Sequence, residues 1–373
     1  AGASLFDNLE LLHWGTEGWI DVYDEPLIRE IGRFIYRAQI DGDFYLNFAD
    51  ASAIILPEPM LIYRYGQRIE DEAMIAHGRW AAVDQHMLDE GIVQGTGRVP
   101  VSLLRALPDL FKLEEAFSAQ SNPPLQRDVW LDEIQVMVAR DRDGSASGLY
   151  VAAKGGHNEE SHNHNDIGNF VVYVDGKPVL IDAGVETYTA RTFSDRRYEI
   201  WTMQSAYHSL LPTIDGVQQL NGEQYAASDV SYEADDDTAS FSLNIAKAYP
   251  PQANVGNWQR IVTLSRGECV DIIDRFRLTQ PAQEIVTTLL TPCDIHLDSG
   301  SITLSELPFG RGYVAGSATV EYDAERFSVE TETLPITDAR MGAVWGDKLQ
   351  RIIFRRVGPD MAESWHWRVS RRP

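Results

Sequence analysis

The sequence has little positive charge. Only 32 lysine and arginine residues stand against 56 aspartate and glutamate residues, so the formal net charge at pH 7 is -24. Binding to nucleic acid depends on basic side chains that release counterions from phosphates, and an acidic surface repels a polyanion at long range. The composition therefore argues against a nucleic-acid partner, and an acidic ligand would have to be held by arginines gathered at one place.

Long apolar runs and cysteines are also scarce. No stretch approaches the roughly 18 uninterrupted apolar residues of a membrane-spanning helix, so we expect no membrane partner. Cys269 and Cys293 are the only cysteines. They have neither CxxC spacing nor a neighbouring histidine, so we predict two buried thiols. They leave the compartment open between the bacterial cytoplasm and the periplasm.

An initiator methionine and a signal-peptide pattern are missing from the first residues, AGASLFDNLELLHW. The leucines in this stretch predict a helix that is already under way. We therefore expect the chain to be a fragment of a longer protein.

The 373 residues exceed the size of one ordinary core and indicate two domains. Apolar residues recur every three or four positions in residues 24–38, 70–88 and 102–113, which predicts amphipathic helices packed on one another. The helical pattern stops at SAQSNPPLQ, where two prolines favour an extended linker. We place a helical domain at residues 1–122 and a second domain at residues 123–373.

The second domain shows the period of two that is typical of β-strands, interrupted by Asp-Gly, Arg-Gly and proline turns. We expect a large antiparallel β-sandwich without helices between its strands. Its strand patterns cover residues 133–156, 169–184, 240–249, 258–278 and 350–358.

Histidines gather in the stretch GGHNEESHNHNDIGNF, residues 155–170. On an extended backbone, the side chains of His162 and His164 would project from the same face. Asp182, at the end of the predicted hairpin 169–184, and His208 are polar groups within apolar segments. With a water molecule, His164, Asp182 and His208 would complete a tetrahedral zinc site. Ordinary hydrogen-bonded histidines and a turn-forming aspartate would give the same pattern.

The residues between Asp182 and His208 combine positive charge with aromatic rings. Arg191, Arg196 and Arg197 could close over an anionic ligand, or could pair with neighbouring acids on a solvated loop. Tyrosine and tryptophan side chains in the same loop offer flat faces that can stack on sugar rings; they are Tyr188, Tyr198 and Trp201.

The stretch KGGHNEESHNHNDIGNFVVYVDGKPVLIDAGVETYT, followed by SAYHSLLPTIDGVQQLNGEQYAA, resembles the heparinase II/III-like family of polysaccharide lyases, which includes oligoalginate lyases. The resemblance implies an α+β multidomain fold, with the last helices of an α/α toroid followed by the β-sandwich. It implies zinc held by His164, Asp182 and His208. It also implies that the catalytic His162 faces the substrate.

The resemblance further implies cleavage of a uronate-containing oligosaccharide or polysaccharide by β-elimination. A base removes the C5 proton of a uronic acid, and polar side chains stabilise the charge that develops beside the carboxylate. We predict that four further residues contact this substrate, namely His157, Tyr188, Arg191 and Tyr198. The family's tyrosine base is expected upstream of residue 1, so the fragment alone should be inactive, and Tyr23 is not expected to replace that base. His208 is followed by Ser209, where relatives carry asparagine.

Two other readings remain open from the sequence. A zinc-containing sandwich could bind carbohydrate, or serve a structural role, without catalysis. An HxH pair with a carboxylate and a later histidine also suits iron, as in a cupin-like oxygenase, which predicts a small barrel and a redox metal. The sequence leaves open a homodimer and the identity of the uronate.

Overall fold

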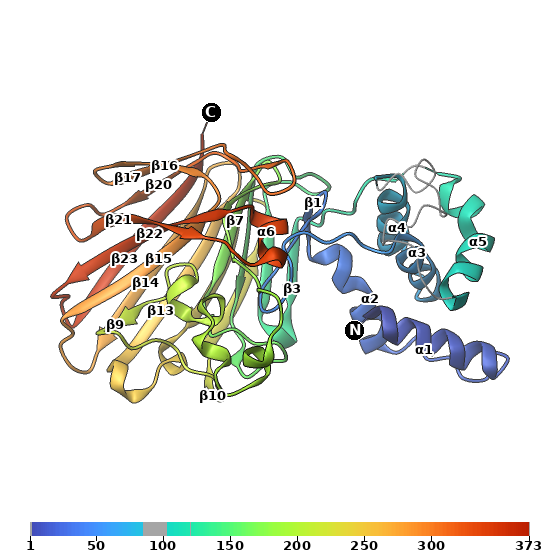
Figure 1. The fold of residues 1–373 in the computed structure, drawn as a ribbon, viewed down its shortest axis with the longest axis horizontal. Helices are drawn as coiled ribbons and strands as arrows, with labels where there is room; N and C mark the ends of the chain where they lie inside the picture. The colour runs from blue at the N-terminus through green and yellow to red at the C-terminus, as the bar shows by residue number, and fades with distance from the viewer. Residues whose placement is uncertain (1, 85–102, 120, 373) are drawn as a thin grey trace. The chain divides into compact units, whose positions relative to one another are not determined.

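The computed structural model describes residues 2–84, 103–119 and 121–372, and it divides into two compact units (Figure 1). The first unit contains residues 1–39 and 55–126, and the second contains residues 40–54 and 127–373. The segment 40–54 lies within the range that the sequence assigns to the helical domain, yet it groups with the strands. The predicted division at residues 122 and 123 is wrong for this segment.

The first unit consists of helices whose apolar side chains pack in two clusters, a larger one that includes Phe6 and Tyr65 and a smaller one that includes Met60 and Tyr63. Its helices are α1 (Gly2–Gly15), α2 (Pro26–Arg37), α3 (Pro59–Arg68), α4 (Glu72–Asp84) and α5 (Leu103–Phe117). The helical pattern predicted for residues 70–88 is confirmed over α4, and its last four residues lie outside the described residues. Among the described residues, no helix is long and apolar enough to span a bilayer.

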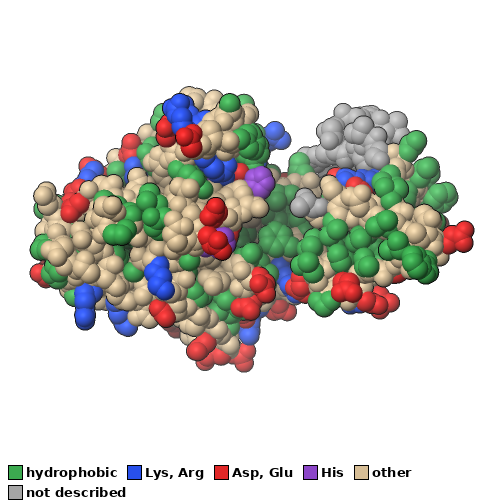
Figure 2. Space-filling view, turned by 90° about the horizontal axis from the view of Figure 1, so that it is seen from below, with side chains coloured by type: hydrophobic (Ala, Val, Ile, Leu, Met, Phe, Trp, Pro, Cys, Tyr) green, Lys and Arg blue, Asp and Glu red, His purple; other side chains and the backbone are tan. Residues whose placement is uncertain are grey.

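The surface of the first unit also carries large apolar side chains. Figure 2 shows hydrophobic side chains gathered on the visible face of this unit. Trp14 is 67% exposed and Phe111 is 81% exposed. Contiguous apolar surface of this kind is typical of contact surfaces, and it distinguishes these helices from the strand-rich unit.

The second unit is built mainly from three antiparallel sheets (Figure 1). The eight-stranded sheet has the order β11 (Ser228–Ala234), β12 (Thr238–Asn244), β13 (Val255–Ser265), β14 (Cys269–Leu278), β23 (Ala362–Arg371), β20 (Ala318–Tyr322), β17 (Ser301–Ser305) and β16 (Asp294–Asp298). The four-stranded sheet has the order β21 (Ser328–Pro335), β22 (Lys348–Val357), β15 (Glu284–Thr291) and β9 (Thr213–Ile214). The five-stranded sheet has the order β3 (Asp128–Leu131), β4 (Val136–Arg140), β5 (Leu149–Lys154), β7 (Phe170–Val174) and β8 (Lys177–Leu180).

Three short strand pairs complete the sheets. They are β1 (Gln39–Asp41) with β2 (Phe44–Tyr45), β6 (His157–Asn158) with β10 (Gly222–Ala226), and β18 (Pro308–Phe309) with β19 (Tyr313–Val314). The prediction of a large antiparallel β-structure is confirmed. The large sheets are open and have edge strands, which differs from the small barrel that a cupin-like oxygenase would require.

Side-chain burial explains the layers. Along β12 and β23, buried and partly exposed positions alternate, so one face of the eight-stranded sheet is buried and the other faces solvent. All residues of β5 and β7 are buried. Residues of the segment 40–54 help to bury these strands. Phe44 packs edge-on against Tyr173 of β7, with ring centroids 5.8 Å apart.

A hairpin places the end of β8 beside the beginning of β7. Its turn residues, Asp175 and Gly176, have positive φ angles of 51° and 76°, as expected for the Asp-Gly turn in the sequence. The turn reverses the chain so that the residues preceding β7 and those following β8 lie at the same edge of the sheet. This hairpin confirms the strand pattern predicted for residues 169–184.

Within the described part of the second unit, one α-helix and seven short 3-10 helices interrupt the strands, contrary to the sequence prediction. Helix α6 (Ala339–Trp345) lies between β21 and β22. Asp338 caps it by accepting a hydrogen bond of 2.9 Å from the backbone N–H of Met341. A single helix of seven residues is too short to give a clear helical period in the sequence.

A buried ion pair ties two loops to the eight-stranded sheet. Arg260 of β13 pairs with Asp274 of β14 at 2.6 Å, and neither side chain is exposed to solvent. The Arg260 guanidinium also donates to the carbonyl oxygens of Gly168, at 2.8 Å, and Leu210, at 2.7 Å. Because Gly168 follows His164 and Leu210 follows His208, this arginine fixes both histidine-bearing loops to the sheet.

Candidate active site

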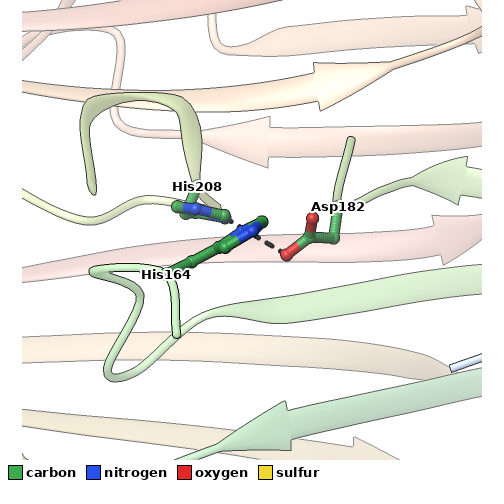
Figure 3. Close-up of side chains that lie close together, drawn as sticks. All are labelled: His164, Asp182 and His208. Atoms are coloured by element: carbon green, nitrogen blue, oxygen red, sulfur yellow. Dashed lines mark ion pairs between the residues drawn. The ribbon is translucent and has the colours of Figure 1, made fainter. Parts of the chain in front are cut away.

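Three predicted metal ligands meet in the interior of the second unit (Figure 3). His164 lies in the loop before β7, Asp182 is the second residue after β8, and His208 lies in the loop before β9. One possible ligand atom from each residue lies within 4.8 Å of the others, and all three residues are buried. The hairpin of β7 and β8 brings His164 close to Asp182, 18 positions further along the sequence, and the loop before β9 adds His208, another 26 positions along.

Asp182 is the acid of this cluster. Its carboxylate lies 3.2 Å from Nδ1 of His208 and accepts hydrogen bonds from the Asn169 amide, at 2.8 Å, and the Gly184 backbone N–H, at 2.7 Å. Burial by itself would raise the pKa of Asp182, but the interactions with His208 outweigh it and lower the pKa below its ordinary value. Asp182 is therefore a carboxylate and can act as an anionic ligand.

The two histidines have ring nitrogens that fit a metal. Nδ1 of His164 and Nε2 of His208 are buried and have no hydrogen-bond partner among the described residues. Leaving a polar atom buried and unpaired costs free energy, and a bound cation would remove that cost. Two imidazoles and one carboxylate are ligands that zinc accepts in proteins. The residues present therefore fit the predicted zinc ion.

His162 lies beside this cluster but faces solvent. Its side chain is 60% exposed, whereas that of His164 is fully buried. His162 also has a φ angle of 63°, a left-handed conformation that is uncommon outside glycine and is often found at functional sites. The segment is a loop, so the prediction that the two histidines share one face of an extended strand is wrong.

One carboxylate that the sequence did not single out joins the two histidines. Oδ2 of Asp50 lies 3.0 Å from Nδ1 of His162, and Oδ1 of Asp50 lies 3.1 Å from Nε2 of His164. A carboxylate that accepts the second N–H of a ligating histidine fixes the orientation of its ring and its tautomer. Asp50 therefore orients the buried imidazole toward Asp182 and His208 and the exposed imidazole toward solvent.

Asp50 is held in turn by two further donors. Arg197 donates to Oδ1 at 2.8 Å, and the Tyr188 hydroxyl donates to Oδ2 at 2.9 Å. Burial would raise the pKa of Asp50, but the hydrogen bonds from His164 and Arg197 lower it below its ordinary value. Asp50 is thus charged and accepts four side-chain donors.

Asp50 belongs to the segment 40–54, which also supports the metal ligands. The side chain of Asn47 donates to the backbone carbonyl of Asp182 at 3.0 Å.

The sequence contains one signal that could have revealed the segment 40–54. Asp41 and Gly42 form an Asp-Gly turn signal between short apolar runs, which favours a hairpin inside the region predicted as helical. Nothing in the local sequence identifies Asp50 itself as the partner of two distant histidines.

The residues predicted to contact substrate occupy different positions. Tyr188 lies next to His162, with its hydroxyl 3.2 Å from Nδ1 of the histidine. Arg191 is exposed and lines a cavity together with Thr189 and Ile200. Tyr198 packs against apolar residues of the same loop, and its hydroxyl accepts a hydrogen bond of 3.3 Å from Asn163.

His157 lies in β6, away from the hydrogen-bonded group around Asp50. Its Nδ1 accepts a hydrogen bond of 3.2 Å from the backbone N–H of Glu159. Among the described residues, it has no hydrogen bond to His162 or to the predicted metal ligands. Its predicted role in substrate binding stays a prediction.

The arginines of the loop have separate roles. Arg196 forms an exposed ion pair with Glu199 at 2.7 Å, as the solvated-loop reading anticipates. Arg197 binds Asp50 and also donates to the backbone carbonyl of Asn163 at 3.0 Å. Arg197 is therefore part of the support for the histidines, and only Arg191 of the three has no ion pair among the described residues.

Three residues outside this site behave as the sequence predicts. Tyr23 is 3% exposed in the helical core, and its hydroxyl donates to Glu10 at 2.8 Å. Burial and this hydrogen bond raise the pKa of Tyr23 well above its ordinary value, which does not suit a base. Cys269 and Cys293 are buried, free thiols.

Comparisons with known proteins match both the sequence and the fold. The family model described as Heparinase II/III-like, C-terminal, matches residues 126–368. A mutant of the heparan sulfate lyase from Pedobacter heparinus superposes with a TM-score of 0.63 at 14% identity, over 92% of this chain and 46% of its own. A solved heparinase III superposes with a TM-score of 0.63 at 13% identity, over 92% of this chain and 46% of its own.

The chain spans about half the length of these solved structures. At these identities, the similarity shows a shared fold. No curated protein sequence matches the chain.

Proposed function

The chain belongs to the heparinase II/III-like family, and on that premise we propose that the whole protein is a polysaccharide lyase that cleaves uronate-containing glycans by β-elimination. The helices of the first unit would form part of an α/α toroid, and the second unit would be the β-sandwich domain. The observation that carries the proposal is the arrangement around Asp50, whose two oxygens contact an exposed His162 and a buried His164.

In the proposed reaction, the C5–H bond of a uronic acid breaks and its electron pair forms the C4–C5 double bond. The C4–O bond breaks at the same stage, and the departing oxygen takes up a proton. The C5 proton is weakly acidic, so its removal requires that the charge developing on the adjacent carboxylate be stabilised.

We assign to His162 the proton-transferring or charge-stabilising role beside that carboxylate. Because Nδ1 is engaged with Asp50, the other ring nitrogen is left to face the substrate. A carboxylate behind an imidazole fixes the orientation of the ring. Tyr188 would stay neutral beside it, because burial and the hydrogen bond to Asp50 raise the pKa of its hydroxyl.

We further propose that His164, Asp182 and His208 hold zinc. When bound, zinc would neutralise Asp182 and cross-link the loops that carry these ligands, which supports a structural role next to His162. Asp182 and the two unpaired ring nitrogens would hold the ion. Metal analysis of the purified protein tests this assignment, since bound iron accompanied by oxygen uptake would contradict it.

The lyase proposal is tested by product formation. The whole protein should convert at least one of alginate, heparan sulfate, chondroitin and hyaluronan, offered as polymers and oligosaccharides, into unsaturated uronates that absorb ultraviolet light. Binding of these glycans without any such product would favour the alternative, a zinc-containing carbohydrate-binding sandwich. The control is the His162→Ala variant, which should form product at least about 100-fold more slowly.

Replacing Asp50 by asparagine should lower turnover by about 10- to 100-fold, the cost of losing an outer partner of a metal ligand. The amide keeps the shape of the side chain but removes the charge that Arg197 and the two histidines share. Steady-state rates and zinc content measure the effect. Asp195→Asn, which changes an exposed acid of the loop that carries Arg197, is the matched control. Equal rates for the Asp50 variant and this control would refute the supporting role.

A further inference from the structure

Three side chains next to His162 form a partly exposed surface, which we call the Tyr188 surface: Tyr188, Phe193 and Arg340. Phe193 packs edge-on against Tyr188, with ring centroids 5.3 Å apart and an interplanar angle of 78°. Phe193 is 73% exposed and Tyr188 is 37% exposed. Aromatic rings that stay exposed beside a polar site offer apolar contact area to a ligand with both polar and apolar faces, such as a sugar.

Arg340 adds a positive charge to this surface. Its guanidinium carbon lies 5.2 Å from the centre of the Tyr188 ring, within the range of a cation–π interaction. It also donates to the backbone carbonyl of Asp50 at 3.3 Å. Arg340 therefore contacts two residues that contact His162.

The position of Arg340 is fixed by the backbone around it. Arg340 lies in the first turn of α6, which Asp338 caps through Met341. The other oxygen of Asp338 accepts a hydrogen bond of 3.1 Å from the backbone N–H of Thr187. One carboxylate thus ties α6 to the loop that carries Tyr188, so the guanidinium and the tyrosine ring keep their relative positions.

The guanidinium of Arg340 contacts the Tyr188 ring, but no acidic side chain among the described residues neutralises its charge. Arg340 forms no ion pair with an acid in the part of the chain that the structure describes, although the chain carries 56 acidic residues. Asp338 is engaged by backbone N–H groups, and the Asp50 carboxylate is engaged by Arg197 and the histidines. The hydrogen bond to the Asp50 carbonyl uses one of five N–H donors of the guanidinium, so further donors remain for a ligand.

We propose that Arg340 binds a carboxylate of the glycan, while Tyr188 and Phe193 pack against the sugar ring that carries it. The planar, forked donors of a guanidinium match the two oxygens of a carboxylate, the acidic group that every uronate carries. The inference rests on the proposed function, because it takes the ligand to be a uronate glycan. It assigns to α6 a binding residue that neither the sequence pattern nor the predicted substrate contacts include.

The test compares a charged ligand with its neutral counterpart. Tetrasaccharides of alginate, hyaluronan, chondroitin and heparan sulfate are screened by calorimetry against the whole protein, and the tightest binder is also prepared with its carboxylates reduced to alcohols. Arg340→Met should weaken binding of the acidic tetrasaccharide by about tenfold, as expected for one charge-assisted contact. It should leave binding of the reduced tetrasaccharide unchanged, and Arg340→Lys should retain part of the preference for the acid.

The matched control is Arg196→Met, which removes an exposed arginine that is already paired with Glu199. This variant should bind both ligands as the unmodified protein does. In turnover, Arg340→Met should raise KM and leave kcat nearly unchanged, since the contact is made in the ground state and in the transition state alike.

Each other outcome overturns a specific claim. If Arg340→Met weakens binding of the acidic and the reduced tetrasaccharide equally, or weakens binding of neither, the carboxylate contact is refuted while the lyase proposal stands. If the loss appears instead with a carboxyl-reduced ligand that retains its sulfates, the arginine binds sulfate and the carboxylate assignment is wrong. If the unmodified protein binds none of the tetrasaccharides, the proposed function itself is contradicted, and the inference is contradicted with it.

Discussion

Replacing His162 by alanine should lower turnover of a uronate substrate by about 100- to 10,000-fold, the range that one general acid–base group contributes. The reason is geometric, because His162 offers an exposed imidazole that Asp50 orients at 3.0 Å through the opposite ring nitrogen. Zinc content should stay close to that of the unmodified protein, since the exposed side chain is not among the three clustered ligands. Steady-state kinetics and metal analysis of the same preparation measure both quantities.

His296→Ala is the matched control for this variant. His296 lies in β16, has a side chain that is 74% exposed, and interacts with Asp298. Its replacement should change neither turnover nor zinc content. If the His162 variant turns over substrate within twofold of the His296 control, His162 has no role in the reaction. If the His162 variant loses zinc, the division of roles between His162 and His164 is contradicted.

Replacing His164 by alanine should abolish zinc binding and destabilise the second unit. The free energy of binding a structural zinc ion contributes directly to folding. The side chain of His164 is fully buried, and its removal leaves the Asp182 carboxylate without one of its compensating partners. Metal analysis and the midpoint of thermal unfolding, Tm, should therefore both fall. Turnover should be lost as well, because the same loop carries His162.

A chelator separates the loss of metal from the loss of the side chain. Removing metal from the unmodified protein should lower its Tm, because the bound ion stabilises only the folded state. The same treatment should leave the Tm of the His164 variant unchanged. If the chelator lowers both Tm values equally, the stabilising metal lies at another site. If it lowers neither, His164, Asp182 and His208 do not form a structural metal site.

Local patterns in the sequence predicted the parts of the fold that local interactions determine. The period of two in residues 169–184 and the turn at Asp175 and Gly176 predicted the hairpin. This hairpin places Asp182 close to the residues that precede β7. A histidine and an aspartate at the two ends of one hairpin are close because the turn makes them so. The hairpin prediction is confirmed for that reason, and His164 and Asp182 lie close together at its ends, while His208 comes from the separate loop before β9.

Residues whose partners are distant in the sequence could not be predicted in this way. Asp50 and His162 are 112 positions apart, and Arg340 and Asp50 are 290 positions apart. Periodicity tells which face of a strand is buried, but it does not tell which distant segment covers that face. The segment 40–54 follows a helix in the sequence and packs with strands in the structure, so sequence order assigned it to the wrong unit.

By itself, the sequence determined the strand-rich second domain, the hairpin and the three candidate metal ligands, because each depends on neighbouring residues or on a motif. Only the tertiary structure decided that His162 is exposed while His164 is buried, and that one carboxylate serves both. It also decided that Arg340 lies over Tyr188. The physical reason is that burial and charge pairing depend on which surfaces meet, and those surfaces come from segments that only the packing of the whole unit brings together.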